Sequence, residues 1–225
     1  MVELLVNSED RPFGSIIVRK HLDDTARLAH QIRWLTRAQG PGVVRLHDVG
    51  RGAGHYSTAF GGRLTLAVAA TTPESTLPIL TRVWFVLERL HRLGLAHGAI
   101  VADHVVIGAD GPLLLSPGGP DPEGADRGDD IASFGRMIGD LAVVWSADAV
   151  VDPSVIDRWI AVGRQITDLG RSPAAAGNDR LVTGAEVRGL LVELSASDRS
   201  GRWFRRRRRY GSSRGRRGGR RRSRS

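Results

Sequence analysis

LHRLGLAHGAIVADHVVIGADGPLLLSPGG, residues 90–119, is the stretch that decides the fold of this chain. It starts at the end of a long apolar run and then gives two short, mostly aliphatic runs, His104 to Ile107 and Pro112 to Leu115, which predict strands. Between them Ala109-Asp110-Gly111 is a turn signal, because glycine reaches positive φ without strain. The stretch therefore predicts a helix end, a loop and a hairpin that runs into Pro117-Gly118-Gly119.

Upstream, the sequence predicts a small β-rich part over about residues 1–70 that contains one helix. The helix is expected from Thr25 to Gln39, where apolar residues recur at helical spacing after two aspartates. The expected strands are Ser15 to Lys20, Val43 to Val49, His55 to Phe60 and Leu64 to Ala70.

Downstream, residues 71–198 predict a larger helical part. Leu77 to Leu93 is apolar nearly all round, which indicates a buried central helix. Asp129 and Asp130 are expected to cap the next helix. The remaining helices are expected at Ile131 to Trp145, Asp152 to Thr167 and Thr183 to Leu194. The fold class is therefore α+β, in two lobes around a cleft.

Charge divides the chain into a domain over residues 1–198 and a tail over 199–225. The tail holds 14 of the 33 basic residues and no acid, whereas the rest of the chain holds the other 19 and all 24 acids, which leaves it at −5. With no aliphatic residue and strong self-repulsion, the tail is expected to be disordered.

Composition excludes several classes of function. The chain has no cysteine, which rules out disulfides, thiolate metal sites and cysteine nucleophiles and agrees with a cytoplasmic location. No apolar run approaches the ~20 residues of a transmembrane helix. Acidic residues near the N-terminus, such as Glu3, argue against a signal peptide.

The stretch from Leu90 to Gly119 resembles the catalytic segment of bacterial serine/threonine protein kinases. In that family a buried helix ends in leucine-histidine and is followed by His-Arg-Asp, a hairpin and Asp-Phe-Gly. Three other segments match in order: IIVRK (16–20) the Val-Ala-Ile-Lys strand, PGVVRL (41–46) the strand after the kinase C helix, and DDIASFG (129–135) the start of the kinase F helix. The resemblance covers roughly residues 14–145 and implies a shortened two-lobe protein-kinase-like fold.

The same resemblance implies that the catalytic groups are missing. Ala99 stands at the catalytic aspartate, His104 at the magnesium-binding asparagine, Pro117-Gly118-Gly119 at Asp-Phe-Gly, and Gln31 at the C-helix glutamate. No glycine-rich loop matches before Gly14. Because phosphoryl transfer rests on positioning and on metal ions that neutralise charge, we expect no catalytic residue, no metal site and no required cofactor. The expected function is that of a pseudokinase-like regulatory or scaffolding module.

Five residues keep the family's pattern. Leu35, Leu46 and His97 are expected in the hydrophobic spine that joins the lobes, and Asp130 beneath the backbone of the His97 loop. Lys20, the only lysine of the chain, stands at the strand lysine that contacts phosphates. Two roles stay open for it: binding of ATP without magnesium-dependent catalysis, or a buried contact with an aspartate or glutamate.

The tail is expected to meet polyanions. Arginines bind phosphates and aromatic rings stack on bases, so nucleic acid is one partner; an anionic membrane surface or an acidic protein is another, and a solubilising tail without a fixed partner is a third reading. The residues expected to make these contacts are Trp203, Phe204, Arg205, Arg206, Arg207, Arg208, Arg209 and Tyr210.

Two rival functions remain open at this point. A divergent, active ATP-dependent Ser/Thr phosphotransferase would have to use Asp103, Asp110 or Asp121 in place of the lost metal ligands, although a solvated turn is the more ordinary role for Asp103. A nucleic-acid-binding protein would use the folded part only to present the tail. In the leading interpretation the folded part meets a protein partner that the sequence does not name.

Overall fold

The computed structural model describes residues 1–7, 15–50, 54–117, 126–147, 151–172 and 183–196. The strands within these residues are β1 (Val2–Asn7), β2 (Ser15–His21), β3 (Leu46–Gly50), β4 (His55–Ala59), β5 (Leu64–Thr65), β6 (Val105–Gly108) and β7 (Gly111–Leu114). The helices are α1 (Thr25–Ala38), α2 (Leu66–Ala69), α3 (Pro73–Arg92), the 3₁₀ turn η1 (Ala102–His104), α4 (Arg127–Ser146), α5 (Pro153–Arg171) and a helix over residues 183–196.

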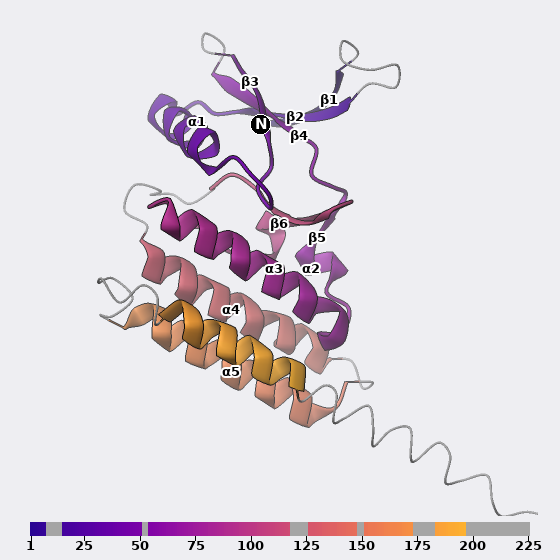
Figure 1. Cartoon of the computed structure of the whole chain (residues 1–225). Coiled ribbons are helices and arrows are strands. Elements are labelled where there is room, and N and C mark those ends of the chain that lie inside the picture. Colours follow the sequence, from indigo (N-terminus) through magenta and orange to yellow (C-terminus); the bar gives the residue numbers. More distant parts are fainter. Residues whose placement is uncertain (8–14, 51–53, 118–125, 148–150, 173–182, 197–225) are drawn as a thin grey trace, which may run out of the picture.

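These elements form a sheet lobe, β1–β4 with α1, and a helical lobe built on α3, α4, α5 and the helix over 183–196 (Figure 1). In the described residues the sheet lobe has one antiparallel sheet with the strand order β1-β2-β4-β3. A second small sheet, in the order β5-β6-β7, lies between the lobes. The expected α+β architecture with a small β-rich lobe and a helical lobe is confirmed.

The helices begin where side chains replace missing backbone partners. Asp24 accepts hydrogen bonds from the amides of Ala26 and Arg27 at the start of α1. Thr72 does the same for the amide of Ser75, and Pro73 then opens α3 at a position where its missing N–H costs nothing.

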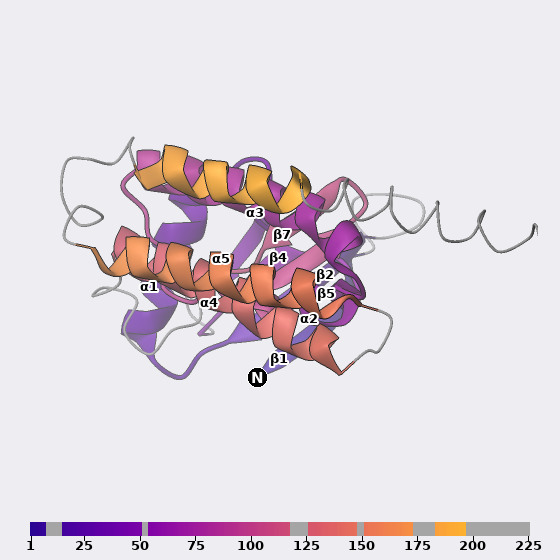
Figure 2. The same ribbon diagram turned by 90° about the horizontal axis from the view of Figure 1, so that it is seen from below.

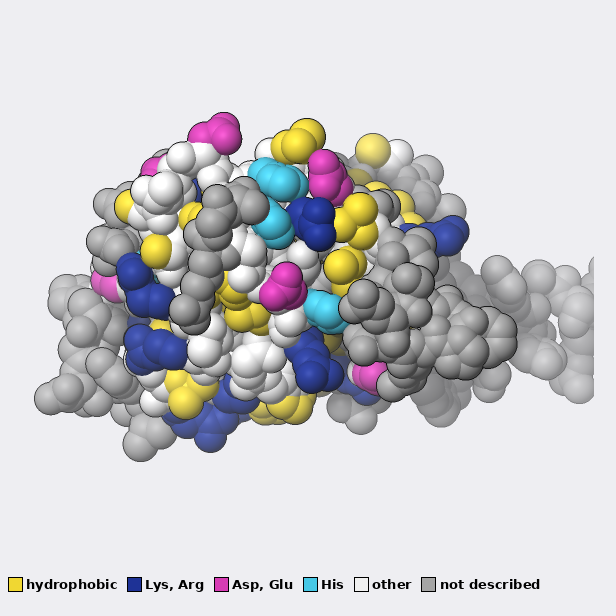
Figure 3. Space-filling view, turned by 90° about the horizontal axis from the view of Figure 1, so that it is seen from above, with side chains coloured by type: hydrophobic (Ala, Val, Ile, Leu, Met, Phe, Trp, Pro, Cys, Tyr) yellow, Lys and Arg dark blue, Asp and Glu magenta, His cyan; other side chains and the backbone are white. Residues whose placement is uncertain are grey.

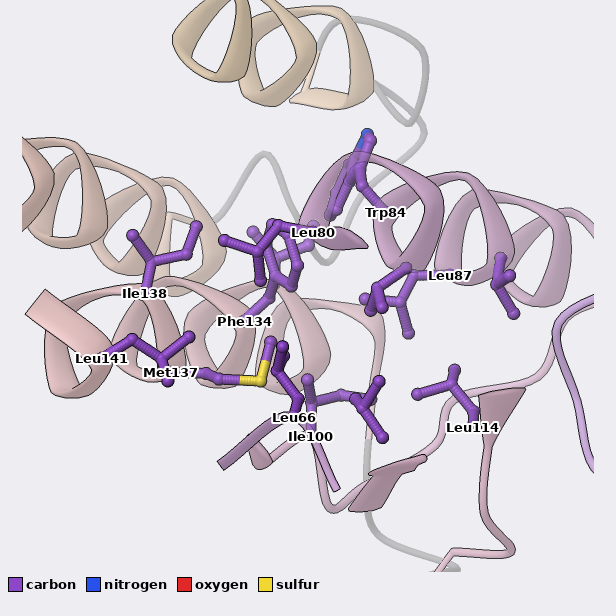
Figure 4. Packing of buried hydrophobic residues seen from close by; sticks show 14 of the residues in the cluster. Leu66, Leu80, Trp84, Leu87, Ile100, Leu114, Phe134, Met137, Ile138 and Leu141 are labelled. Atoms are coloured by element: carbon purple, nitrogen blue, oxygen red, sulfur yellow. The ribbon is translucent and has the colours of Figure 1, made fainter. Parts of the chain in front are cut away.

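The core of the helical lobe forms where α3 lies across α4. The indole of Trp84 and the ring of Phe134 have centroids 5.3 Å apart. Figure 4 shows how side chains from both helices and from the β5–β7 region meet there. The most completely buried of the labelled residues are Leu66, Leu80, Trp84, Leu87, Phe134 and Ile138.

Helices α4 and α5 approach each other so closely that their contact surface needs glycine. A Cβ at Gly170 would lie 2.6 Å from the carbonyl oxygen of Gly128, and a Cβ at Gly163 would lie 2.8 Å from that of Gly135. Real side chains do not tolerate such distances, so these glycines set the spacing of the two helices (Figure 2).

Two expectations about local structure are wrong, and one strand was missed. The strand expected from Leu64 to Ala70 ends at Thr65, because Leu66 enters a helical turn that buries its side chain completely. The cap of α4 is Asp126, in a reciprocal capping box with Asp129, while Asp130 points into the interior. Strand β1 was not expected at all.

Strand β1 is defined by its pairing with β2, which is why the sequence alone did not reveal it. Its six residues pair from Val2↔Lys20 to Asn7↔Ser15. A strand this short is defined by the neighbour that supplies its hydrogen bonds, and that neighbour is not a local property of the sequence. None of the helices in the described ranges is both long and apolar enough to cross a membrane.

Candidate functional site at the junction of the lobes

Asp130, in the first turn of α4, is the central residue on the helical-lobe side of the junction between the lobes, here called its lower half. Its side chain is fully buried. One carboxylate oxygen accepts hydrogen bonds from the backbone N–H of His97 at 2.8 Å and from the ring Nε2 of His91 at 2.9 Å. The other oxygen accepts from the backbone N–H of Gly98 at 2.8 Å. The carboxylate therefore fixes the backbone of the His97 loop from α4, the place that the resemblance implies for it.

His97 is held in one neutral form by its surroundings. Its Nε2 lies 2.8 Å from the carbonyl oxygen of Leu115 and must donate, while Nδ1 lies 3.3 Å from the amide of Ala99 and must accept. Burial lowers the pKa of His97 below its ordinary value, although the nearby Asp130 carboxylate opposes the shift. The ring also packs edge-on against Trp34, with centroids 5.4 Å apart. His97 thus connects three elements as an uncharged group.

Ala99 and His104, which the resemblance places at the catalytic aspartate and the magnesium-binding asparagine, are joined by a hydrogen bond and contribute no carboxylate. The Nδ1 of His104 donates to the carbonyl oxygen of Ala99 at 2.8 Å. His104 therefore closes the loop between the two positions through its imidazole, and its Nδ1 is occupied by that contact. Ala99 has only a methyl group to offer a substrate hydroxyl.

On the sheet-lobe side of the junction, here called its upper half, four side chains and one carbonyl form a chain of hydrogen bonds. Lys20 Nζ lies 3.3 Å from Ser116 Oγ, which lies 2.7 Å from the hydroxyl of Tyr56. The Tyr56 hydroxyl donates to Gln31 Oε1 at 2.7 Å, and Gln31 Nε2 donates to the carbonyl oxygen of Pro117 at 2.7 Å. The chain joins β2, β4, α1 and the segment after β7.

In each of these hydrogen bonds the donor and the acceptor are defined. The Pro117 oxygen can only accept, which orients the amide of Gln31 and leaves its oxygen to accept from Tyr56. Since the phenol proton is used there, the Ser116 hydroxyl donates to Tyr56 and in turn accepts from Lys20. All hydrogen bonds run the same way, from Lys20 to Pro117, an arrangement in which neighbouring bonds polarise one another.

Burial disfavours the charged forms of Tyr56 and Lys20, the two titratable groups of this hydrogen-bond chain. Burial raises the pKa of Tyr56 to about 12, against the hydrogen bond from Ser116 and the positive field of Arg27. Burial also lowers the pKa of Lys20, and the nearby Arg27 adds to that shift. Lys20 makes no ion pair with a carboxylate among the described residues, so the contact with an aspartate or glutamate considered above is not found there; its partner is Ser116.

Helix α1 is fastened to the helical lobe at several points along its length. Trp34 Nε1 donates to the carbonyl oxygen of Ala96 at 2.7 Å. Arg37 donates to the carbonyl of Leu93, at the C-terminus of α3, while Arg89 of α3 donates to that of Ala38, at the C-terminus of α1. Each guanidinium thus neutralises the free carbonyls at the end of the other helix. Together with Gln31, these contacts fix α1 against the lobe below.

The residues expected in the spine occupy the interior between the lobes. Leu35 is completely buried in the common core, and Leu46 is partly buried and packs against the same core. The fourth spine position, Gly118, lies outside the described residues, as do Gly119 and the loop after it.

Among the described residues, the aspartates considered above as replacement metal ligands do not form a cluster. Asp103 is exposed and accepts a hydrogen bond from Thr65 Oγ1 at 3.2 Å, and Asp110 is exposed at the turn between β6 and β7. Asp121 lies outside the described residues. Within the described ranges, no three His, Asp or Glu side chains come together as metal ligands would.

Sequence reasoning missed Tyr56 and Ser116, which are central to the hydrogen-bond chain. Tyr56 lies in a short strand whose alternating pattern does not indicate a polar partner. Ser116 lies just before Pro117-Gly118-Gly119, the segment that the resemblance matches to Asp-Phe-Gly. The one available signal was Gln31, because a neutral residue at the position of a paired glutamate requires a neutral partner. The tail residues from Trp203 to Tyr210 lie outside the described residues.

Comparison with known proteins bears on the fold. No protein-family model matches the sequence, and a search of curated proteins finds no relative. Among solved structures, the chain is similar to the kinase domain of PknI from Mycobacterium tuberculosis, determined as a single-residue mutant, with a TM-score of 0.62 and 17% sequence identity. The match covers 86% of this chain and 90% of that chain. At this identity the likeness establishes the fold alone: the chain has a protein-kinase-like fold.

Proposed function

We propose that this chain is a catalytically inactive protein-kinase-like domain that works as a scaffold or regulatory module for a protein partner. The observation that carries the proposal is the hydrogen-bond chain from Lys20 to the Pro117 carbonyl, in which no carboxylate takes part. In an active kinase this region holds a charged pair and a metal-binding aspartate, and both are needed to position the phosphates.

The residues at the junction do not fit a magnesium–nucleotide complex. Magnesium prefers oxygen ligands, chiefly carboxylates and water. The position of the metal-binding aspartate has only the Pro117 carbonyl, which already accepts from Gln31. The asparagine position carries an imidazole whose Nδ1 donates to Ala99. The proposed function therefore involves neither a metal ion nor a catalytic residue.

The fixed position of α1 supports a scaffold. Contacts from Gln31, Trp34 and Arg37 tie this helix to the helical lobe, and Arg89 ties it from the other side. These contacts hold the helix from its middle to its C-terminal end, so that part of it presents one constant surface. Such a surface suits a module that is recognised by a partner.

Thermal melting in the presence of ATP tests the proposal. We expect the melting temperature to respond no more to ATP with magnesium than to ATP alone. A small shift with ATP alone, lost in Lys20→Ala, would assign metal-independent nucleotide binding to Lys20 and leave the inactive assignment in place. A clearly larger shift with magnesium would contradict the proposal, since a ligand stabilises only the state that binds it.

We also propose that residues 199–225 bind polyanions, with nucleic acid as the first candidate. On the face of the sheet lobe seen in Figure 3, basic and acidic side chains are interspersed, whereas the tail carries 14 arginines and no acid. The main attraction for phosphates is therefore assigned to the tail.

Removal of residues 199–225 tests this second proposal. The full chain should bind single-stranded RNA or DNA with little sequence preference, and the shortened chain should not. Affinity should fall as salt rises, with a slope of log affinity against log salt of roughly −0.7 per phosphate contact. Replacing Trp203, Phe204 and Tyr210 by alanine should cost about 1–3 kcal/mol per stacked base without changing that slope. Equal binding by both chains would exclude the tail, and binding only to anionic vesicles would assign it to membranes.

A further inference from the structure

A groove lies between α5 and the helix over residues 183–196, on the side of the molecule away from the sheet lobe. The two helices run side by side (Figures 1 and 2), and the space between them has a volume of about 550 Å³. Leu169 and Leu190 form its apolar part; both are partly buried and pack against the core. A Cβ at Gly189 would meet nothing within 4 Å, so the groove is open at that point.

The polar lining of this groove includes three acidic side chains. Asp168 comes from α5, and Glu186 and Glu193 come from the last helix. The arginine nearest to them on that helix, Arg188, pairs with Glu88 of α3 instead of turning toward the groove. Arg171 of α5 does not line the groove either. The groove therefore combines an apolar floor with negative charge.

The chain itself contains a segment of matching chemistry next to this groove. Residues 199–225 start three residues after the end of the last helix, and residues 203–209 are two aromatic residues followed by five consecutive arginines. Glu186 lies ten residues before residue 196, which is about 15 Å along a helix. An extended chain spans that distance in about five residues. The tail is therefore long enough to reach the groove, and its positive charge and aromatic rings match the acidic and apolar lining.

We infer that Trp203, Phe204 and the arginines from Arg205 to Arg209 of the same chain bind in this groove. The aromatic rings contact Leu169 and Leu190, and the guanidinium groups pair with Asp168 and Glu186. This inference does not rest on the proposed function, because it concerns a surface far from the lobe junction. If the tail also binds nucleic acid, the groove and the nucleic acid compete for the same arginines.

A spin label in the tail tests this inference on the full-length protein. The chain has no cysteine, so Ser212→Cys gives a single attachment point for a nitroxide. At low salt we expect the label to broaden the NMR amide signals of Gly189 and Leu190, relative to the reduced label, and to leave that of Val106 in β6 sharp. The broadening should be lost at 1 M salt, where the Debye length falls to about 3 Å.

Two charge-matched variants of the labelled protein make the test specific. The variant Asp168→Asn/Glu186→Gln/Glu193→Gln should lose the broadening at low salt. The control Asp48→Asn/Asp110→Asn/Asp140→Asn removes the same charge from exposed aspartates elsewhere and should keep it.

Three results would overturn the inference. Absence of broadening in the parent protein would show that the tail does not visit the groove. Equal loss in both triple variants would show a general attraction to a negative domain. Broadening that appears only when isotope-labelled protein is mixed with a spin-labelled second copy would show that the occupant is the tail of another molecule.

Discussion

Asp130 and Gln31 are both fully buried polar side chains at the junction of the lobes, and each accepts or donates every hydrogen bond that its neighbours require. Asp130 is a carboxylate surrounded by donors, at the position where the resemblance implies an aspartate. Gln31 is a neutral amide where the resemblance implies a glutamate. The lower half of the junction therefore contains a carboxylate at the implied position, and the upper half contains a neutral amide.

The difference separates two tasks that share one region of a kinase-like fold. The lower carboxylate fixes loop backbone, and its removal leaves buried donors unpaired, which is costly in any protein. In the upper half, Gln31, Tyr56 and Ser116 bond to one another and to the Pro117 carbonyl without a carboxylate. Fold alone does not determine activity, which depends on site residues such as these.

Asp130→Ala tests the lower half and should have the largest effect. It leaves the amides of His97 and Gly98 without an acceptor inside the protein, and it leaves His91 without its partner. Breaking a buried charged contact of this kind costs roughly 3–5 kcal/mol. Urea unfolding should show this loss, or the variant should fail to fold. Asp140→Ala, on an exposed position of the same helix, is the control and should change stability little; equal values for the two variants would contradict the assignment.

Gly170→Val tests whether α5 holds α4, and with it Asp130, in place. The added side chain would collide with the backbone around Gly128 and Ala132, on either side of Asp130 in the first turns of α4. Overpacking of this kind costs about 1–3 kcal/mol. Gly139→Ala is the control, because a Cβ there meets nothing within 4 Å. In a helix interior that change should stabilise by roughly 0.5–1 kcal/mol. The same sign for both variants would argue against close packing of α4 and α5.

Tyr56→Phe tests the upper half. It removes the donor to Gln31 and the acceptor of Ser116 while keeping the ring. We expect a loss of about 1–3 kcal/mol in thermal or urea unfolding, since buried polar atoms lose a partner. The double variant Tyr56→Phe/Ser116→Ala should lose less than the two single changes summed, because the residues share one chain. Strict additivity would mean that the hydrogen bonds are not coupled.

The pH dependence of stability gives the smallest predicted effect. Burial lowers the pKa of His97 below the ordinary value of about 6.5, so the unfolded chain binds this proton more readily than the folded one. The stabilisation is complete above pH 6.5 and decreases as the pH falls below it, by at most about 1.4 kcal/mol per pH unit. Urea midpoints between pH 7 and 5.5 should show the decrease, and His97→Gln should flatten it. The exposed His47→Gln is the control; a flattened profile in that variant would assign the effect elsewhere.

The sequence predicted the order of the main elements because caps, turns and apolar runs are local. Asp24 and the hairpin at Gly111 each act within a few residues. The cap at Thr72 was not predicted, and α3 begins at Pro73 rather than at Leu77. The sequence could not reveal the hydrogen-bond chain, since Lys20 and Ser116 are separated by 96 residues and Tyr56 meets Gln31 only after β4 has joined the sheet. The strand predicted from Leu64 to Ala70 was wrong for a similar reason. Tertiary burial of Leu66 outweighed an aliphatic pattern that is typical of a strand.

Transfer of labelled phosphate from ATP is the most direct test of the central claim. The purified full chain should transfer none to itself or to a general protein substrate, with magnesium or with manganese, because Ala99, His104 and Pro117 supply neither a base nor metal-binding carboxylates. Lys20→Ala serves as the matched control and should be indistinguishable from the parent. Measurable transfer by the parent that Lys20→Ala abolishes would contradict the account, and the chain would then be an active phosphotransferase.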